Sequence, residues 1–228
     1  MHDFVIRPPN MSEHKVAAFF ATRQMPDDRK VLASYAGIGP QSVYLPIQKH
    51  TDIVQIIESD LTPHIADAVV THRAGLLIGV KTADCVPVLL YDEKRRVVGA
   101  VHAGWRSSAQ AILTKALAVF TDRFYSNPVD ILIAFGPAIC SDCYEVGSEV
   151  IEGVVKATGP GDYVSKRGSK YHIDLRAANR LQALVFGIPA AKIWMSAECT
   201  CCRPEKYYSY RYAKGTTGRL YSMIAQKQ

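Results

Sequence analysis

Short, almost entirely apolar runs dominate the middle of the chain. The clearest are residues 76–81, 86–91 and 97–102. A strand with one face in water alternates polar and apolar residues, whereas these runs do not, so we predict strands buried on both faces of a sheet. Further strands are predicted over residues 15–22, 42–47, 53–57, 129–135, 192–195, 207–212 and 220–225.

A helical spacing of apolar residues follows the last of these central runs. It extends to about residue 124, and either Ser107 or Ser108 is a suitable N-cap for the helix that it predicts. Asp174 is an equally suitable cap for a later helix. The other predicted helices cover residues 27–35 and 148–156, and the helix capped by Asp174 covers residues 174–186.

The order of these elements predicts an α+β fold. The central strands follow one another too closely for helical crossovers, so hairpins are favoured over a doubly wound parallel sheet. The sequence has no internal repeat, low-complexity stretch or linker, and a length of 228 residues suits one large domain. We therefore predict a single domain over residues 1–228.

Composition and charge restrict the expected binding partners and the expected location of the protein. No apolar run approaches the roughly 18 residues that span a bilayer, and residues 1–9 lack the apolar core of a secretion signal. The cytoplasm is therefore the expected location, with no membrane association. The net charge of +6 is not gathered into a basic run with interleaved aromatic residues, so we expect it to serve a small anion and not a nucleic acid. Oligomeric state is left open.

Three side chains that can bind a metal stand at the ends of apolar runs. Cys85 and His102 lie beside two of the central strands, and His50 precedes the run at 53–57. Two imidazoles and one thiolate form a donor set that suits Zn²⁺, with Cu²⁺ less favoured. Three protein ligands leave a fourth position for water or substrate, which is typical of catalytic zinc sites. The alternative from the residues alone is a buried cysteine with two core histidines.

A series of short motifs along the chain resembles the multicopper polyphenol oxidase (laccase) domain family. Each motif is weak alone, but their order and spacing are specific, and together they extend from residue 21 to the C-terminus. The motifs are Gln48-Lys49-His50, Ala66-Asp67-Ala68, Thr82-Ala83-Asp84-Cys85-Val86-Pro87, His102-Ala103-Gly104-Trp105-Arg106, Gly136-Pro137-Ala138-Ile139, Cys143-Tyr144-Glu145-Val146-Gly147, Cys199-Thr200, Tyr208-Ser209-Tyr210-Arg211 and Thr217-Gly218-Arg219.

The resemblance implies a fold, a metal and a reaction. The fold is a single-domain sandwich of mixed sheet and helices, similar to the catalytic domain of a deamidating bacterial toxin. The metal is zinc held by His50, Cys85 and His102. The family's members, later described as purine nucleoside phosphorylases, cleave adenosine, inosine, guanosine and methylthioadenosine with phosphate and also deaminate adenosine. A purine nucleoside and phosphate are therefore the expected small-molecule substrates.

One departure from the family pattern concerns the N-terminal region. Family members usually carry a Gly-Gly-containing loop after the Thr-Arg of the first strand, but here Thr22-Arg23-Gln24 passes almost directly into residues 25–29. If that loop covers substrate, nucleoside preference or turnover differs in this chain, while the metal ligands are unaffected.

Other charged residues near the motifs are candidates for the chemistry. Arg106 follows His102 closely and is predicted to hold phosphate oxygens bidentately, the alternative being a surface arginine stacked on Trp105. Arg23 and Arg211 are further candidates for phosphate binding. Asp84, beside Cys85, is predicted to orient a ligand or exchange a proton with the purine, the alternative being the cap of a turn. Cys85 and Arg106, with Asp84, make up the predicted catalytic set.

The remaining cysteines offer a rival metal site. Cys140 with Cys143, and Cys199 with Cys202, both have the Cys-x-x-Cys spacing of structural zinc sites. Against this, the first pair lies within a family motif, and more than fifty residues separate the pairs. The four-cysteine site is therefore not favoured, and Cys201 has no assigned role. His64 and His72 match no family ligand and are expected to be solvated.

Three other functions are also compatible with these residues. Cys85 activated by His102 would make a hydrolase or deamidase, and an editing enzyme for cell-wall precursors is a related alternative. A copper polyphenol oxidase is the second, although one three-ligand site lacks the several coppers that reduce dioxygen to water. A zinc-binding module without catalytic activity is the third. The favoured interpretation is a zinc-dependent purine nucleoside phosphorylase that also deaminates adenosine.

Overall fold

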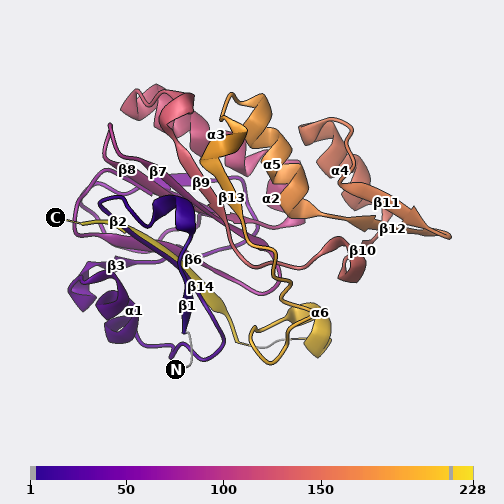
Figure 1. Cartoon of the computed structure of the whole chain (residues 1–228), viewed down its shortest axis with the longest axis horizontal. Coiled ribbons are helices and arrows are strands. Elements are labelled where there is room, and N and C mark those ends of the chain that lie inside the picture. The colour runs from indigo at the N-terminus through magenta and orange to yellow at the C-terminus, as the bar shows by residue number, and fades with distance from the viewer. Residues whose placement is uncertain (1–3, 216–217, 228) are drawn as a thin grey trace.

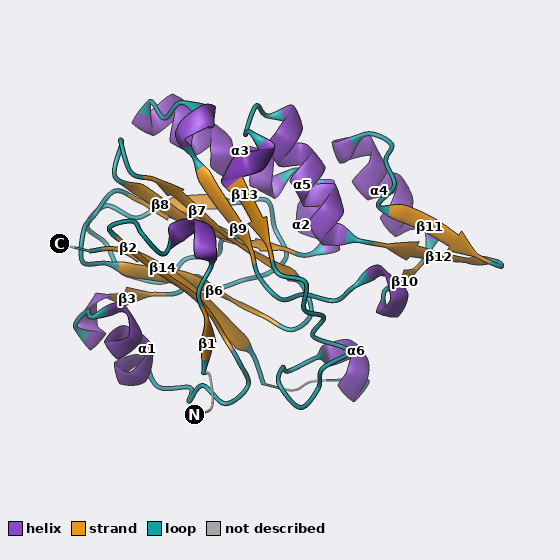
Figure 2. Ribbon diagram, viewed as in Figure 1, coloured by secondary structure: helices purple, strands orange, loops and turns teal. Residues whose placement is uncertain are grey.

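Two β-sheets form the centre of the molecule (Figures 1 and 2). The computed structural model describes residues 4–215 and 218–227. The six-stranded sheet has the order β13 (Ile193–Met195), β9 (Leu132–Phe135), β7 (Val86–Asp92), β8 (Val97–Ala103), β5 (Ala68–Thr71) and β4 (Val54–Ile56). The five-stranded sheet has the order β1 (Val5–Ile6), β2 (Val16–Ala21), β14 (Leu220–Gln226), β6 (Leu77–Thr82) and β3 (Val43–Tyr44).

Helices cover the outer faces of this pair of sheets. Side chains of both sheets, among them Phe20, Ile78 and Leu89, form one buried cluster between them. A second cluster packs the six-stranded sheet against α2 (Trp105–Ala109), α3 (Ile112–Ala118), α4 (Ser148–Thr158) and α5 (Leu175–Val185). A third packs α1 (Arg29–Ala36) on the five-stranded sheet. Figure 1 shows α2 to α5 above the sheets and α1 below them.

Smaller elements complete the chain. A three-stranded sheet of β10 (Glu145–Val146), β12 (Lys170–Ile173) and β11 (Val164–Arg167) extends to one side (Figure 2). A short helix α6 (Tyr210–Ala213) lies near the end of the chain. The single-turn elements are η1 (Pro9–Met11), η2 (Pro40–Ser42), the π-turn η3 (Val119–Arg123), η4 (Pro128–Asp130), η5 (Ser141–Cys143) and η6 (Ala190–Lys192).

The predicted α+β class is confirmed. The central hairpin of β7 and β8 is antiparallel, as the close spacing of these strands predicted. Three pairs are parallel, namely β4 with β5, β9 with β13, and β3 with β6, so the sheets are mixed. Every residue of β7 and β8 is buried, because the five-stranded sheet covers one face of these strands and helices cover the other.

The long helix predicted to follow β8 is interrupted. It begins at Trp105 with Gly104 as N-cap, and it breaks before α3 at Ala111, whose φ of +56° is left-handed. The predicted serine cap is wrong because Ser107 and Ser108 are buried within α2, where Ser108 Oγ accepts a hydrogen bond of 2.9 Å from Asn179 of α5. Packing against α5, not capping, explains the burial of Ser108.

The strand predicted over 207–212 is also wrong. Ser209 accepts a hydrogen bond from the backbone N–H of Tyr212 and so caps α6. Strands β1, β5 and β10 were missed, as was the β11–β12 hairpin, whose first strand is mostly exposed and basic. Asp174 caps α5, as predicted, and Asp28 caps α1. Thr217 of the last family motif lies outside the described residues.

Within the described residues, no helix combines the length and the apolar character needed to cross a bilayer.

Candidate metal centre and its cavity

Three donors from distant parts of the chain converge at one end of the six-stranded sheet. Cys85 directly precedes β7, His102 lies near the end of β8, and His50 lies in the loop before β4. The donor atoms of the three side chains all lie within 4.8 Å of one another, and Cys85 Sγ is 3.8 Å from His50 Nε2. Ligands of one tetrahedral zinc are about 3.3–3.8 Å apart. The three residues predicted from the sequence are therefore placed where one ion can reach all of them after small adjustments.

A buried carboxylate orients both histidines. Asp67 Oδ1 is 2.7 Å from His102 Nδ1, which leaves Nε2 of that ring free to face the other donors. Asp67 Oδ2 accepts hydrogen bonds from the backbone N–H groups of Lys49 and Thr51, on either side of His50. His50 itself has a left-handed φ of +58°, a conformation rare outside glycine. Asp67 thus fixes one ring directly and the turn that carries the other.

Charge within this group shifts three pKa values. Burial opposes the thiolate of Cys85, but the charge on His102 and hydrogen bonds with both histidines outweigh it and lower the pKa of Cys85 to about 6. Burial also opposes the imidazolium of His102, yet the thiolate and Asp67 raise its pKa to about 9. For Asp67, burial is outweighed by hydrogen bonds from His102 and Thr51, and its pKa falls to about 2. The metal-free group therefore holds a thiolate–imidazolium pair near neutral pH.

Gly104 makes room for the donors. A Cβ at this position would lie 2.9 Å from Cδ2 of His50 and 3.0 Å from Sγ of Cys85. Contacts this short force the neighbouring atoms to move. The glycine after His102-Ala103 is thus required by the close approach of the other two donors.

The donors open into a cavity of about 800 Å³. His50, Cys85 and His102 all line it, which matches an ion with an open coordination position. The wall carries four cationic side chains and three aromatic ones: Lys81, Arg106, Arg211 and Arg219, with Trp105, Tyr144 and Tyr210. Such a mixture suits a ligand with both an anionic group and a flat ring.

The predicted phosphate-binding arginines occupy different positions. Arg106 is exposed in the cavity with its guanidinium 4.4 Å from the centre of the Trp105 ring. Arg211 also lines the cavity, but its guanidinium donates to the backbone carbonyls of Cys143 and Glu145. Arg23 is not among the cavity residues, because its guanidinium lies over Tyr208 and donates to the carbonyl of residue 204. The structure therefore brings two of these three arginines to the cavity.

Asp84 is largely occupied by hydrogen bonds. It accepts one of 2.6 Å from Thr200 Oγ1 and one of 2.8 Å from the backbone N–H of Arg211. Both carboxylate oxygens are thus used to hold the 200 and 211 segments beside Cys85. The orienting carboxylate expected at Asp84 is supplied by Asp67, and Asp84 positions the cavity wall.

The sequence did not single out Asp67, which lies buried behind the donors, or four residues of the cavity wall. Asp67 lay inside a family motif but was given no role, although a lone carboxylate in an apolar run needs a partner when buried. Lys81 stands immediately before the Thr82-Ala83-Asp84-Cys85 motif, and Tyr144, Tyr210 and Arg219 each lie in a motif named above. The motifs were the available signal, but only the tertiary structure shows that Lys81, Tyr144, Tyr210 and Arg219 face one cavity.

Two further histidines lie on the surface, whereas four of the remaining cysteines form a cluster. His64 and His72 are exposed, as expected, with His64 3.6 Å from Asp60. Cys140, Cys143, Cys199 and Cys202, in contrast, come together in a second group, also within 4.8 Å. Their separation in sequence argued wrongly against a shared site, because a parallel β-bridge between Ala138 and Cys199 brings the two segments together.

Comparison with known proteins shows the family to which the chain belongs. The family model described as multi-copper polyphenol oxidoreductase laccase matches residues 21–227. "Adenosine deaminase RL5" from an unidentified prokaryote is 37% identical over 214 residues, which cover 88% of this chain and 81% of that protein. A "Purine nucleoside phosphorylase" from Bacteroides thetaiotaomicron is 33% identical over 198 residues, covering 81% and 73%. The crystal structure of YlmD from Geobacillus stearothermophilus superposes with a TM-score of 0.90 at 27% identity, covering 100% and 98%. The chain is an enzyme that belongs to the multi-copper polyphenol oxidoreductase laccase family.

Proposed function

We propose that this enzyme cleaves purine nucleosides with phosphate, deaminates adenosine, and binds Zn²⁺ through His50, Cys85 and His102. The observation that carries the proposal is the position of these three donors in a cavity whose wall combines arginines with aromatic rings. The names of the relatives, a purine nucleoside phosphorylase and an adenosine deaminase, supply the substrate class.

The donor set fits zinc. Two nitrogens and one sulfur are borderline-soft ligands, and Asp67 holds one ring nitrogen as a carboxylate does in many zinc sites. The lowered pKa of Cys85 to about 6 supplies the thiolate that a metal needs. When bound there, Zn²⁺ would act as a Lewis acid on phosphate or lower the pKa of water, which are the contributions that phosphorolysis and deamination require.

The remaining wall can bind the two parts of the substrate. Arg106 is the best candidate for phosphate, because the described contacts include no hydrogen bond from its guanidinium and five donors stay available. Cations cover the rings of Trp105 and Tyr144, whereas Tyr210 is 53% exposed and has no cation over it among the described contacts. We therefore assign purine stacking to Tyr210.

Phosphorolysis also needs a proton for the departing base. The bond from the anomeric carbon to the purine nitrogen breaks, a bond to a phosphate oxygen forms, and the base takes up a proton. Burial and the nearby Cys85 charge raise the pKa of Tyr144, so its hydroxyl stays protonated near neutral pH. We therefore assign Tyr144 as a hydrogen-bond donor to the base, and the proton that the base takes up comes from solvent.

One observation favours a second candidate. A thiolate with a depressed pKa beside an imidazolium is also the nucleophile of Cys–His hydrolases and deamidases. In that case an alkylating reagent abolishes activity and a chelator leaves it intact. The zinc proposal requires the chelator to abolish activity and added Zn²⁺ to restore it. A binding module without catalysis is set aside because the relatives are named as enzymes.

The deciding experiment combines metal analysis with a product assay. The purified protein is incubated with adenosine, with and without phosphate, and adenine and inosine are separated. Zinc that is lost when His50 and His102 are replaced by alanine, adenine that forms only with phosphate, and inosine in both reactions would support the proposal. Copper in place of zinc, with oxidation of phenols, would support the polyphenol oxidase alternative. Zinc without either purine product would contradict the proposed reactions, and editing of cell-wall precursors would then be the activity to assay.

A further inference from the structure

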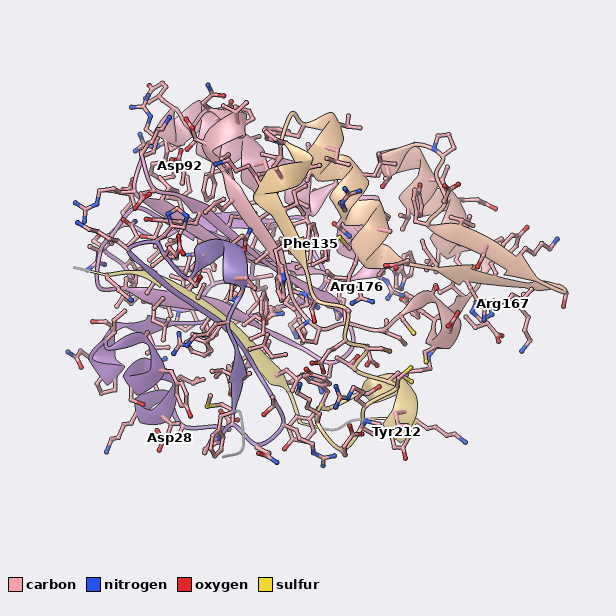
Figure 3. The ribbon with its side chains drawn as sticks, in the orientation of Figure 1. Asp28, Asp92, Phe135, Arg167, Arg176 and Tyr212 are labelled. Atoms are coloured by element: carbon pink, nitrogen blue, oxygen red, sulfur yellow. The ribbon has the colours of Figure 1, made fainter. Side chains whose placement is uncertain are left out.

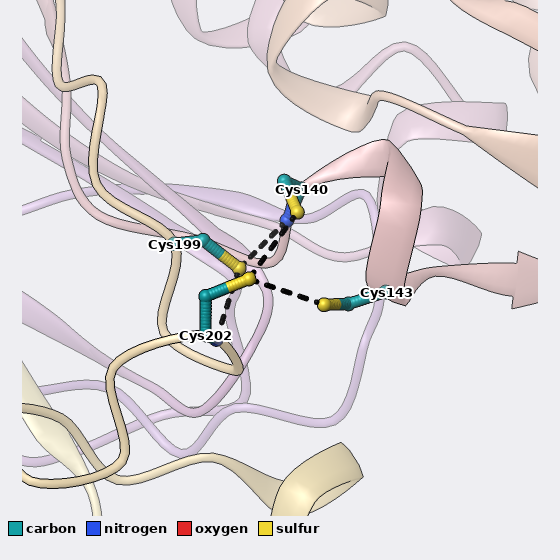
Figure 4. Close-up of side chains that lie close together, drawn as sticks. All are labelled: Cys140, Cys143, Cys199 and Cys202. Atoms are coloured by element: carbon teal, nitrogen blue, oxygen red, sulfur yellow. Dashed lines mark hydrogen bonds between the residues drawn. The ribbon is translucent and has the colours of Figure 1, made fainter.

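The second cysteine group lies between two loops beside the cavity wall. Cys140 and Cys143 lie at the single turn η5, and Cys199 and Cys202 follow β13 on another loop. Figure 4 shows the four side chains pointing toward one another from these two loops. None of the four lines the cavity that contains Cys85.

The spacing of the sulfurs matches a single tetrahedral ion. With Zn–S bonds of about 2.3 Å, neighbouring sulfurs in a regular tetrahedron are about 3.8 Å apart. Cys202 Sγ lies 3.9 Å from Cys140 Sγ and 3.3 Å from Cys143 Sγ, and all four sulfurs lie within 4.8 Å of one another. A cluster of two or more irons would spread its cysteine sulfurs further apart. One ion therefore fits this group better than an iron–sulfur cluster does.

Backbone groups already support thiolate character. The N–H groups of Cys140 and Cys202 are directed at Sγ of Cys199, at 3.2 and 3.4 Å. Sulfur is a much better acceptor as a thiolate than as a thiol. Cys199 is also buried, where a charged sulfur needs compensation by a cation.

A disulfide describes the group less well. Sγ of Cys143 and Sγ of Cys202 are 3.3 Å apart, well beyond the roughly 2.05 Å of an S–S bond. All the cysteines are free. A disulfide between any two of the four would also leave the convergence of the other two sulfurs on the same point unexplained. Two Cys-x-x-Cys segments with four converging sulfurs are instead the donor set of a closed, structural zinc site.

We propose that Cys140, Cys143, Cys199 and Cys202 bind a second Zn²⁺ as four thiolates. This site is separate from the three-donor group and does not rest on the proposed reaction. With four protein ligands it has no open position, so its contribution is structural.

The proposed ion would join loops that shape the cavity wall. Tyr144 follows Cys143 directly, and the backbone carbonyl of Cys143 accepts a hydrogen bond of 3.3 Å from Arg211. Thr200 follows Cys199 and donates to Asp84, the residue before Cys85. Arg176 at the start of α5, labelled in Figure 3, donates to the carbonyls of Ser196 and Glu198 and so holds the approach to Cys199. The site therefore positions Tyr144, Arg211 and Asp84 from behind.

The test uses variants that empty one site at a time. In the full chain, His50→Ala with His102→Ala should leave about one zinc per chain, and X-ray absorption should show four sulfur ligands at about 2.3 Å. Cys140→Ser with Cys143→Ser should remove that zinc and keep the zinc of the other site. Cys201→Ser is the matched control, because Cys201 is the neighbouring cysteine outside the four, and it should keep both metals.

A second measurement covers the case in which the double serine variant does not fold. The single Cys202→Ser variant changes the one exposed cysteine of the four, and amide hydrogen exchange should accelerate in residues 139–145 and 198–203 but not in β7. A mercurial titration of the His50→Ala/His102→Ala protein should release zinc as the thiols react. Absence of zinc from that protein, nitrogen or oxygen ligands around it, iron in its place, or a disulfide among the four cysteines would each overturn the proposal. If zinc is bound there but nucleosides are not processed, only the proposed function fails.

Discussion

The two donor groups differ both in their ligands and in their surroundings. His50, Cys85 and His102 face a cavity of about 800 Å³ and are supported from behind by a buried carboxylate. The four cysteines face one another between two loops and line no part of that cavity. Three ligands with access to a cavity suit chemistry, whereas four ligands without it suit cross-linking. The number of donors and the presence of a cavity are therefore the two features on which we base the catalytic role proposed for one group and the structural role proposed for the other.

The hydrogen bonds that hold the two donor groups in place also differ. Asp67 fixes His102 through its ring nitrogen and fixes the turn at His50 through two backbone N–H groups, so the open site depends on one buried charge. The four-cysteine group has backbone N–H groups directed at Cys199 and no carboxylate among the described contacts. We therefore expect the open site to be sensitive to single charge changes and the four-cysteine site to be sensitive to loss of its sulfurs.

The largest effect should come from His102→Ala. Removing this ligand should lower nucleoside turnover by about a thousandfold or more, because a catalytic metal supplies several kcal/mol of transition-state stabilisation. Zinc in the four-cysteine group should be retained. His64→Ala is the control, since His64 is exposed and does not line the cavity, and it should leave turnover unchanged. Turnover of adenosine and zinc content measure the two effects. Near-normal turnover of His102→Ala would remove the open site from the reaction.

Asp67→Asn should have the next largest effect. Loss of the charge that orients His102 should weaken zinc binding at the open site by about 10–100-fold, with the four-cysteine site unaffected. Asp60→Asn is a matched control, because Asp60 also pairs with a histidine, His64, but on the surface at 3.6 Å. Competition with a chelating dye measures the affinity. Equal affinities for the two variants would contradict the role given to Asp67.

The sequence predicted the open site better than the four-cysteine site. His50, Cys85 and His102 were found because each lies in or next to an apolar run and belongs to a motif, and strand ends meet when strands pair. The four cysteines lie in loops, where no periodic pattern specifies which segments meet. Their long separation in sequence argued against a shared site, but a single β-bridge from Ala138 to Cys199 removes that separation in space.

The same distinction holds for the fold. Buried strands such as β7 and β8 were predicted because a uniform apolar run of this length is stable in water only when both of its faces are covered. The 207–212 segment was wrongly predicted as a strand, and the β11–β12 hairpin was missed. Tyr210, Arg211 and Tyr212 are exposed, as are most residues of β11, so local hydrogen bonds such as that from Tyr212 to Ser209 decide the conformation there. Arg23 shows the corresponding limit for function, since a motif position does not reveal that a guanidinium is already bound to Tyr208 and a backbone carbonyl.

Gly104→Ala tests how tightly the open site is packed. The added Cβ would displace His50 and Cys85 by a few tenths of an ångström, and overpacking of this kind costs about 1 kcal/mol or more. Zinc affinity at the open site should fall by about tenfold. Gly215→Ala, where a Cβ meets nothing within 4 Å, should have no effect on either site. The same chelator competition measures both variants, and an unchanged affinity in Gly104→Ala would show that the donors tolerate more space than the structure indicates.

The smallest effect should be a pH window in thermal stability that belongs to the open site alone. After a chelator has removed the open-site metal, Cys85 with a pKa of about 6 and His102 with a pKa of about 9 form an ion pair. The pKa of Cys85 is lowered on folding, so its contribution is lost as pH falls through about 6. The pKa of His102 is raised on folding, so its contribution is lost as pH rises through about 9.

The expected change in stability is small. Because Cys85 is only half-buried and faces the cavity, solvent screens the pair. A loss of about 1 kcal/mol corresponds to about 2–4 °C in Tm for a chain of this size. Thermal unfolding of the chelated protein across about pH 5–10 measures this against Cys85→Ser, which should lack the fall on the acid side. An identical pH profile in the two proteins would show that the thiolate–imidazolium pair does not stabilise the metal-free site.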